Sequence, residues 1–423
     1  MSTVDRRTRL LGDTVELGAG WLHDELPSIL SETGALGARG VEVLGLSPLS
    51  LVVDGVTATL AREDGRLVVR EGTAEEGLIA ALDASALSEL VQDVVSTFGL
   101  SMAARVDMRR GTIDDFVAWE PVLRALLDDR PVYEPGNVTF RALDGGDLDL
   151  GRSFSLDDSP DEIGHFLTEA GFLHLRGVFT DDEMAAVSAD LDDAVAAATR
   201  DDGASWWART EDQGWYASRI LGFNLKSPTL QELLSSDRFD AIGRFTDDAM
   251  VQRPPREGDS AEGLLKKVAV VEGISDVSWH KDCSMGGHSR RCCDLVVGIS
   301  VTGADQASGE LGVIPGSHRA NVQPLDVRAD LDLPRIPLPT RTGDCTVHCS
   351  CTLHMSRPPI ERGRRVVYTG FNLAPRAGDV VTPVDPEETR RARHALNDQV
   401  RSRQERGEFD RGDPGLFALP ERR

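Results

Sequence analysis

The stretch from Ser278 to Arg365 carries the motifs from which the fold and the chemistry of this chain can be inferred. In order, these motifs are SWHKD (278–282), GELGVIPGSHR (309–319), GD (343–344), LHMS (353–356) and RR (364–365). His280 and Asp282 are two residues apart, so on a β-strand their side chains point to the same face. One imidazole and one carboxylate are two of the three ligands of a 2-His-1-carboxylate site, which holds non-haem Fe(II). The third ligand is expected to be a histidine from a distant strand.

The combination of these motifs resembles the phytanoyl-CoA dioxygenase family of Fe(II)- and 2-oxoglutarate-dependent oxygenases, over about residues 155–375. The resemblance implies that His354 is the third iron ligand. It also implies that Arg365, eleven residues after His354, binds the distal carboxylate of 2-oxoglutarate with help from Ser356. A guanidinium suits this role because it is always charged and binds a carboxylate through two parallel hydrogen bonds. Fe(II) is therefore the expected metal, with 2-oxoglutarate and O2 as co-substrates.

The fold expected for the catalytic core is a double-stranded β-helix, a jelly-roll of the cupin-like kind, with flanking helices. Short strands separated by turns, with two ligands early and one late, agree with it. We expect this core over residues 159–385, because the signals for helices and strands sharpen at Ser159. A linker rich in Gly, Pro and Asp precedes it over residues 131–158, and a charged C-terminal helix and tail follows over residues 386–423.

Residues 1–130 are expected to form a separate, small α+β module. Asp-Gly pairs at 54–55 and 64–65 predict a strand meander between residues 49 and 69. Asp83 can cap a following amphipathic helix, and residues 116–127 predict another. The module weakly resembles the sterol-carrier-like lipid-binding fold, and a structural or dimerisation role is the alternative. The lipid-binding hypothesis fails if residues 1–130 bind no acyl or sterol probe.

Helices and aromatic residues are expected around the core strands. Capping boxes beginning at Ser159 and Thr180 predict two helices that flank a short strand over residues 171–177, and residues 230–250 predict a further helix. Residues 264–271 form a predicted strand in which either Lys266 or Lys267 faces inward. The candidate substrate contacts lie in a predicted loop at the substrate entrance and just after it, and are Trp206, Trp207, Trp215, Tyr216, Arg219 and Asn224. Packing of an insert onto the core is the alternative for the aromatic residues.

Two other metal-site interpretations remain open from the sequence. His348 competes with His354 for the third ligand position because the two are six residues apart and would share one face of an unbroken strand. His318 could also ligate, although it lies in a turn. Structural zinc is the second interpretation, because Cys345, Cys349 and Cys351 crowd around these histidines, with Cys283, Cys292 and Cys293 upstream. Zinc sites favour Cys-x2–4-Cys pairs, which are not arranged regularly here.

Composition limits the partners. The chain has 423 residues with a formal net charge of −24, which argues against binding to nucleic acid or to an anionic membrane. It has no long apolar run and no apolar segment after the first residues, so we expect no membrane insertion and a cytoplasmic protein. The expected partner is a small-molecule substrate, with an apolar or carrier-bound substrate favoured if the N-terminal module binds lipid. The oligomeric state is not predicted.

The expected activity is hydroxylation of an unactivated C–H bond of a small-molecule, natural-product or acyl substrate, with release of succinate and CO2. The resemblance supports oxygenation, because related halogenases lack the carboxylate that Asp282 provides. Desaturation, epoxidation or cyclisation would use the same residues. The rival classes are a non-catalytic cupin-like binding or sensor protein and a scaffold stabilised by zinc.

Overall fold

The computed structural model describes residues 15–246, 250–252, 254–273, 276–285, 294–327 and 331–374. The chain divides into two units. The first contains residues 1–139 together with 281–292 and 317–332, and the second contains residues 140–280, 293–316 and 333–423. The predicted C-terminal helix and tail over 386–423 and the thiols of Cys292 and Cys293 lie outside the described residues. Each unit is described by itself.

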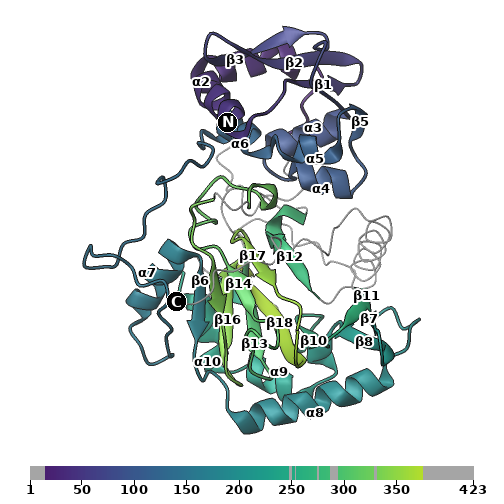
Figure 1. Ribbon diagram of the computed structural model, residues 1–423, viewed down its shortest axis with the longest axis vertical. Coiled ribbons are helices and arrows are strands. Elements are labelled where there is room, and N and C mark those ends of the chain that lie inside the picture. The colour runs from purple at the N-terminus through teal and green to yellow at the C-terminus, as the bar shows by residue number, and fades with distance from the viewer. Residues whose placement is uncertain are drawn as a thin grey trace. The chain divides into compact units, whose positions relative to one another are not determined.

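The first unit is built on a five-stranded sheet in the order β3-β2-β1-β4-β5 (Figure 1). Its strands are β1 Leu49–Val53, β2 Val56–Glu63, β3 Arg66–Glu71, β4 Leu78–Leu82 and β5 Asp107–Arg110. β1 pairs with β4 in parallel, and the other pairs are antiparallel. Both Asp-Gly turns have positive φ at both residues, as a type I′ hairpin turn requires. The predicted meander is therefore present.

Helices complete the first unit: α1 Trp21–Asp24, α2 Leu26–Leu44, α3 Ala84–Val91, α4 Thr97–Met102, α5 Ile113–Val117 and α6 Glu120–Asp128. Asp83 caps α3 as predicted, accepting a hydrogen bond from the amide of Ala86 at 2.6 Å. The single helix predicted over residues 116–127 is two helices, because Pro121 starts α6 in its first turn. At Gly37 in α2 a Cβ would lie 2.4 Å from Leu126, so glycine allows α2 to pack closely on α6.

A buried ionic network lies at α6. The side chain of Arg124 is 0% exposed and ion-pairs with Glu120 at 3.1 Å, Asp128 at 3.1 Å and Asp93 at 3.3 Å. Its guanidinium also donates a hydrogen bond to the carbonyl of Leu90 at 2.6 Å. Removing one partner from such a buried network leaves uncompensated charges in a medium of low dielectric constant.

We predict that Arg124→Met lowers the free energy of unfolding of the first unit by about 3–5 kcal/mol, because three carboxylates lose their cation. The matched control is Arg39→Met, whose ion pair with Glu134 is exposed to solvent and should contribute little. Chemical denaturation of both variants measures the difference. Equal effects of the two substitutions would contradict the prediction.

The second unit contains two antiparallel sheets. The larger sheet has nine strands in the order β11-β7-β8-β10-β18-β13-β16-β6, with β9 also pairing with β18. These strands are β6 Phe172–Leu175, β7 Ser205–Thr210, β8 Gly214–Ile220, β9 Met250–Gln252, β10 Glu262–Lys266, β11 Val270–Glu272, β13 Asp294–Ser300, β16 Cys345–Cys349 and β18 Arg364–Leu373. The smaller sheet has the order β12-β17-β14-β15, formed by β12 Val277–His280, β14 Leu311–Val313, β15 Ile336–Leu338 and β17 His354–Ser356.

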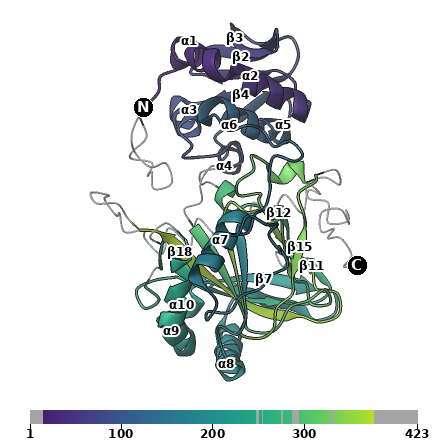
Figure 2. The same ribbon diagram turned by 90° about the vertical axis from the view of Figure 1, so that its left-hand side faces the viewer.

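The two faces of the larger sheet differ in chemistry. Its outer face packs against the helices, which are α7 Pro160–Ala170, α8 Asp181–Ala197, α9 Pro228–Leu234 and α10 Asp237–Asp240 (Figure 2). Leu295, Val297 and Ile299 of β13 belong to this apolar core. Because strand residues alternate between faces, the residues between them point to the inner face, toward the smaller sheet. This is the two-sheet jelly-roll architecture expected from the sequence.

The structure corrects three local predictions. Thr180 forms its capping box on α8, but Ser159 makes no side-chain cap, and α7 begins simply at Pro160. Residues 230–250 do not form one helix, because the hydroxyl of Ser236 bonds back to the carbonyl of Leu233 and a new short helix starts there. The aromatic residues between 206 and 216 belong to the hairpin β7–β8, where a loop was expected.

Asp344 ties β6 to the start of β16. Its carboxylate accepts hydrogen bonds from His174 Nε2 at 3.0 Å and from the amides of Gly177 and Arg341 at 2.9 and 2.8 Å. Burial raises the pKa of this carboxyl, but the hydrogen bonds outweigh burial and hold the pKa below its usual value. The preceding Gly343 has φ +82°, and a Cβ there would lie 2.0 Å from the carbonyl of Phe179. The Gly-Asp motif therefore serves to join these strands.

Candidate metal centre

Two histidines are placed side by side by strand pairing in the smaller sheet. His280 ends β12 and pairs in register with His354, the first residue of β17. Their ring centroids are 4.1 Å apart. Nδ1 of His280 lies 2.7 Å from the carbonyl of Ser278, and Nδ1 of His354 lies 2.9 Å from the carbonyl of Thr352. Because Nδ1–H donates to these carbonyls, the tautomer of the neutral ring that they favour carries its lone pair on Nε2, the atom available to bind a metal.

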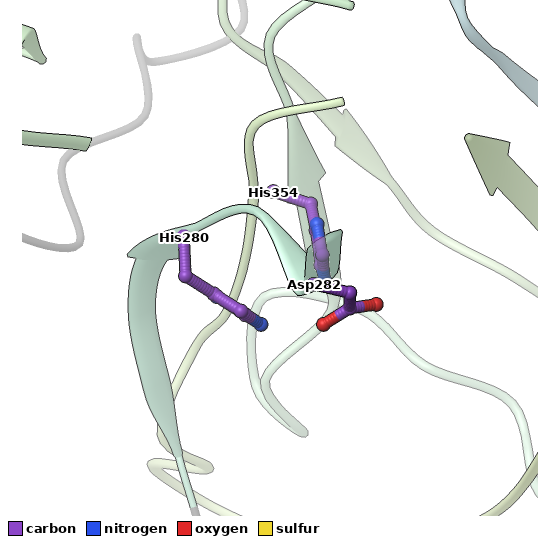
Figure 3. Close-up of side chains that lie close together, drawn as sticks. All are labelled: His280, Asp282 and His354. Carbon is purple, nitrogen blue, oxygen red and sulfur yellow. The ribbon is translucent and has the colours of Figure 1, made fainter. Parts of the chain in front are cut away.

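The carboxylate of Asp282 joins the two imidazoles (Figure 3). One ligand atom from each of His280, Asp282 and His354 lies within 4.8 Å of the others. Asp282 reaches this position from the first residue of the 3-10 helix η5, Asp282–Met285, because β12 has already ended at His280. The alternation within a strand that we used to group His280 with Asp282 is therefore not the local structure that brings them together.

The geometry of the site does not support the alternative metal ligands that the sequence left open. His348 on β16 is buried and its ring lies 4.1 Å from that of His354, but among the described residues the metal-binding group does not include it. His318 and the described cysteines are likewise outside the group. Burial raises the pKa of the Cys345 thiol far above its usual value, so this thiol stays protonated. A thiolate-bound zinc ion finds no support in this part of the chain.

A buried cationic cluster meets the smaller sheet at Ser356. Nη2 of Arg364 donates a hydrogen bond to Oγ of Ser356 at 3.0 Å, and Nζ of Lys266 also contacts this oxygen. Ser356 is two residues beyond His354 on β17, so both face the same way. Nε of Arg364 is buried and has no hydrogen-bond partner among the described residues. An unsatisfied guanidinium donor is costly in a protein interior, so Arg364 is a candidate anion-binding residue.

Arg365 takes a different direction from the one expected. Its Nη1 donates to the carbonyl of Ser188 at 2.9 Å and to its hydroxyl at 2.6 Å, and its Nη2 ion-pairs with Asp192 at 2.6 Å. Both partners belong to α8, on the outer side of the larger sheet. Neighbouring residues of a strand face opposite sides, so turning Arg364 inward turns Arg365 outward. The sequence spacing therefore does not locate the guanidinium that contacts Ser356.

Lys266 is the second inward cation that sequence analysis did not select. The strand predicted over residues 264–271 ends at Lys266, which pairs in register with Arg364 of β18. Cross-strand partners share a face, so both side chains point inward. The sequence feature that could have identified Lys266 is a lysine in an otherwise apolar strand, at a position that alternation directs to the inner face.

The candidate substrate residues divide between the two faces of the hairpin. Trp206 and Arg219 pair across β7 and β8, with the guanidinium 4.5 Å from the indole and 3.1 Å from the carboxylate of Glu262. Arg219 also pairs with Leu264, so it lies on the face that carries Lys266. Tyr216 is buried beneath the ammonium of Lys267, at 4.7 Å from the ring centroid.

Three candidates have other neighbours. Trp215 is 37% exposed and stacks with Arg200, while the indole of Trp207 donates to the hydroxyl of Ser205 at 3.0 Å. The amide of Asn224 is fully buried and bonds to the backbone of the loop over residues 255–261 through four hydrogen bonds. Asn224 therefore holds that loop, and no substrate contact is needed to explain it.

Comparison with known proteins identifies the domain. Residues 167–366 match the family model described as phytanoyl-CoA dioxygenase (PhyH). The match begins within α7 and ends at Val366 in β18, and it includes the three metal-site residues and Ser356. The chain therefore contains a domain of the PhyH family. No curated protein matches the chain.

Solved structures with low similarity complete the comparison. AviO1 from Streptomyces viridochromogenes Tue57 is 20% identical, with 54% of this chain and 98% of that chain covered and a TM-score of 0.41. EctD from S. alaskensis, solved with 2-oxoglutarate and 5-hydroxyectoine, is 20% identical, with coverages of 58% and 86% and a TM-score of 0.42. SnoN, described as a non-heme alpha-ketoglutarate-dependent epimerase from nogalamycin biosynthesis, is 17% identical, with coverages of 54% and 90% and a TM-score of 0.40.

Within the described residues, no helix combines the length and apolarity needed to cross a bilayer.

We predict that His354→Ala weakens Fe(II) binding by more than about 100-fold, a greater loss than changes to outer groups cause, because a ligand is removed. His348→Ala should retain the metal, since the imidazole of His348 is outside the group. Anaerobic Fe(II) titration of the purified full chain measures both affinities. Loss of metal in His348→Ala with retention in His354→Ala would reverse the assignment.

Proposed function

We propose that this protein is an Fe(II)- and 2-oxoglutarate-dependent oxygenase that acts on a small-molecule substrate. The observation that carries the proposal is that β17 brings a His-Asp-His group and a buried cationic cluster close together, the first through His354 and the second through Ser356. A metal site alone suits many functions. A metal site with an anion site behind it suits a co-substrate that is chelated at one end and carries a carboxylate at the other.

The donor set fits iron. His280, Asp282 and His354 offer two neutral imidazole nitrogens and one carboxylate, the combination typical of non-haem Fe(II) sites with open positions. Iron, when bound, would supply the oxidative chemistry in which O2 and 2-oxoglutarate are consumed and succinate and CO2 are released. The carbonyls of Ser278 and Thr352 fix the orientation of the two rings, so the ligands are positioned before the metal arrives.

The cationic cluster fits the distal carboxylate of 2-oxoglutarate. Arg364 presents a buried Nε–H that has no partner among the described residues, and its Nη2 is anchored by Ser356. The hydrogen bond to Ser356 fixes the orientation of the guanidinium, and its remaining N–H donors can then bind a carboxylate with the geometry that the planar group requires. We therefore assign to Arg364 the role that the sequence resemblance suggested for Arg365, with Ser356 as the supporting residue in both cases.

The residues around this site would confine the substrate. Trp206 and Arg219 lie on the inner side of the hairpin β7–β8 and offer an aromatic surface beside a charge. Hydroxylation of an unactivated C–H bond is the simplest outcome for such a site. Neither a binding-only protein nor a zinc scaffold is favoured by any described contact.

The test is succinate formation from 2-oxoglutarate by the anaerobically Fe(II)-loaded chain after exposure to O2. We expect activity in the wild type, and loss of it in Asp282→Ala because a ligand is removed. We expect Arg364→Met to raise the KM for 2-oxoglutarate by about 100-fold, the usual consequence of truncating a buried charge partner.

The matched variant is Arg365→Met, which removes the outward guanidinium and its ion pair with Asp192. Its KM for 2-oxoglutarate should stay within about twofold of the wild type, because partly exposed ion pairs contribute little. A large rise in KM for Arg365→Met and none for Arg364→Met would instead support the assignment drawn from sequence spacing. Absence of both succinate and a visible charge-transfer band on adding 2-oxoglutarate would refute the oxygenase.

A further inference from the structure

Lys266 and Arg364 are two basic residues whose side chains meet at one point of the fold. They are register partners on the adjacent strands β10 and β18, and their side chains are 4% and 6% exposed. Both reach the hydroxyl of Ser356. Like charges directly opposite on a sheet are destabilising, and burial makes the repulsion stronger.

The charged groups around Lys266 do not neutralise the pair. Arg364 on β18 and Arg219 on β8 both oppose a charge on Lys266, and Asp276, just before β12, favours it. Arg219 is already ion-paired with Glu262 of β10. From β17, the uncharged hydroxyl of Ser356 contacts Lys266, and the imidazole of His354 lies two residues before it on the same face. In the part of the chain that the structure describes, neither Lys266 nor Arg364 forms an ion pair. One or two negative charges could therefore be balanced by this cluster.

Burial governs the protonation of the lysine. It lowers the pKa of Lys266 well below the usual value, and repulsion by Arg364 lowers the pKa further. Arginine side chains, by contrast, stay charged in proteins. The two basic residues therefore differ: the arginine carries a permanent charge, whereas the charge of Lys266 depends on the groups beside it.

We propose that Lys266 is a second cation of the co-substrate site and that it takes up one proton from solvent when the distal carboxylate of 2-oxoglutarate binds. This inference rests on the proposed function. The carboxylate arrives as an anion, the amine of Lys266 becomes an ammonium, and the two then form a charge-assisted pair beside Arg364. No bond to carbon changes, and the proton is the only species added.

The pH dependence has a definite sign. Binding of the carboxylate raises the pKa of Lys266 above its value in the free protein. Affinity is highest below the pKa of the free protein, where the lysine is already charged. It falls as pH rises between the two pKa values, by up to about tenfold per pH unit. Proton uptake occurs only in that window.

The experiment is isothermal titration of 2-oxoglutarate into the anaerobic Fe(II)-loaded chain, in buffers of different ionisation enthalpy and over a range of pH. Three proteins are compared: the wild type, Lys266→Met and Lys267→Met. Lys267 is the matched control because it is next in sequence but partly exposed, with its ammonium hydrogen-bonded to Gln213 at 3.1 Å. 2-Oxopentanoate, which has the same chain length but no distal carboxylate, separates this proton from any proton moved at the metal.

We expect the wild type and Lys267→Met to take up close to one proton for each 2-oxoglutarate bound. In Lys266→Met, uptake with 2-oxoglutarate should be no greater than uptake with 2-oxopentanoate. We also expect Lys266→Met to weaken 2-oxoglutarate about 10- to 100-fold where the lysine is charged, the range for a charge-assisted hydrogen bond. Its thermal stability should not fall, because methionine fills a similar volume without a buried charge.

The outcomes separate the two proposals. Equal uptake and equal affinity in the wild type and Lys266→Met would overturn this inference and leave the proposed function intact. No binding of 2-oxoglutarate to any of the three proteins would overturn the proposed function, and this inference with it.

Discussion

The pairing of β12 with β17 is the constraint on which the functional site depends. It sets His280 opposite His354, and the alternation of β17 then directs Ser356 to the same side two residues further on. A slip of one residue in this pairing would turn both His354 and Ser356 away from the larger sheet. The metal group and the anion site therefore both depend on the register between β12 and β17, so a shift in this pairing would displace both.

The larger sheet has a helix-covered outer face and an inner face on which charged side chains lie among apolar ones such as Leu264 and Val366. Its outer face is covered by helices and carries the apolar core, as in Leu295, Val297 and Ile299. Its inner face carries Lys266, Arg364 and His348, which cannot be buried cheaply unless they have charged or polar partners. A jelly-roll shields these side chains from water by closing this face against a second sheet, and the co-substrate carboxylate proposed above would balance the remaining positive charge.

Several elements could be predicted from sequence because their causes are local. Asp-Gly turns, the cap at Asp83 and the capping box at Thr180 depend on contacts within a few residues, and each is present. Local reasoning fails where tertiary packing competes with it. Ser236 interrupts the helix expected over residues 230–250, and the stretch with Trp206 and Tyr216 becomes a hairpin because it can pair with β10.

The sequence alone determined the composition of the site. Two histidines, an aspartate, a serine and a nearby arginine stand in an order that is distinctive without any coordinates. Only the tertiary structure decided which residue of each pair faces inward: His354 with the metal group, Arg364 beside Ser356, and Lys266 opposite Arg364. The physical reason is that a strand has a period of two, so a change of one residue in a connecting loop exchanges its faces. The spacing of residues along the chain does not show which face of the strand points inward, whereas the pairing between strands does.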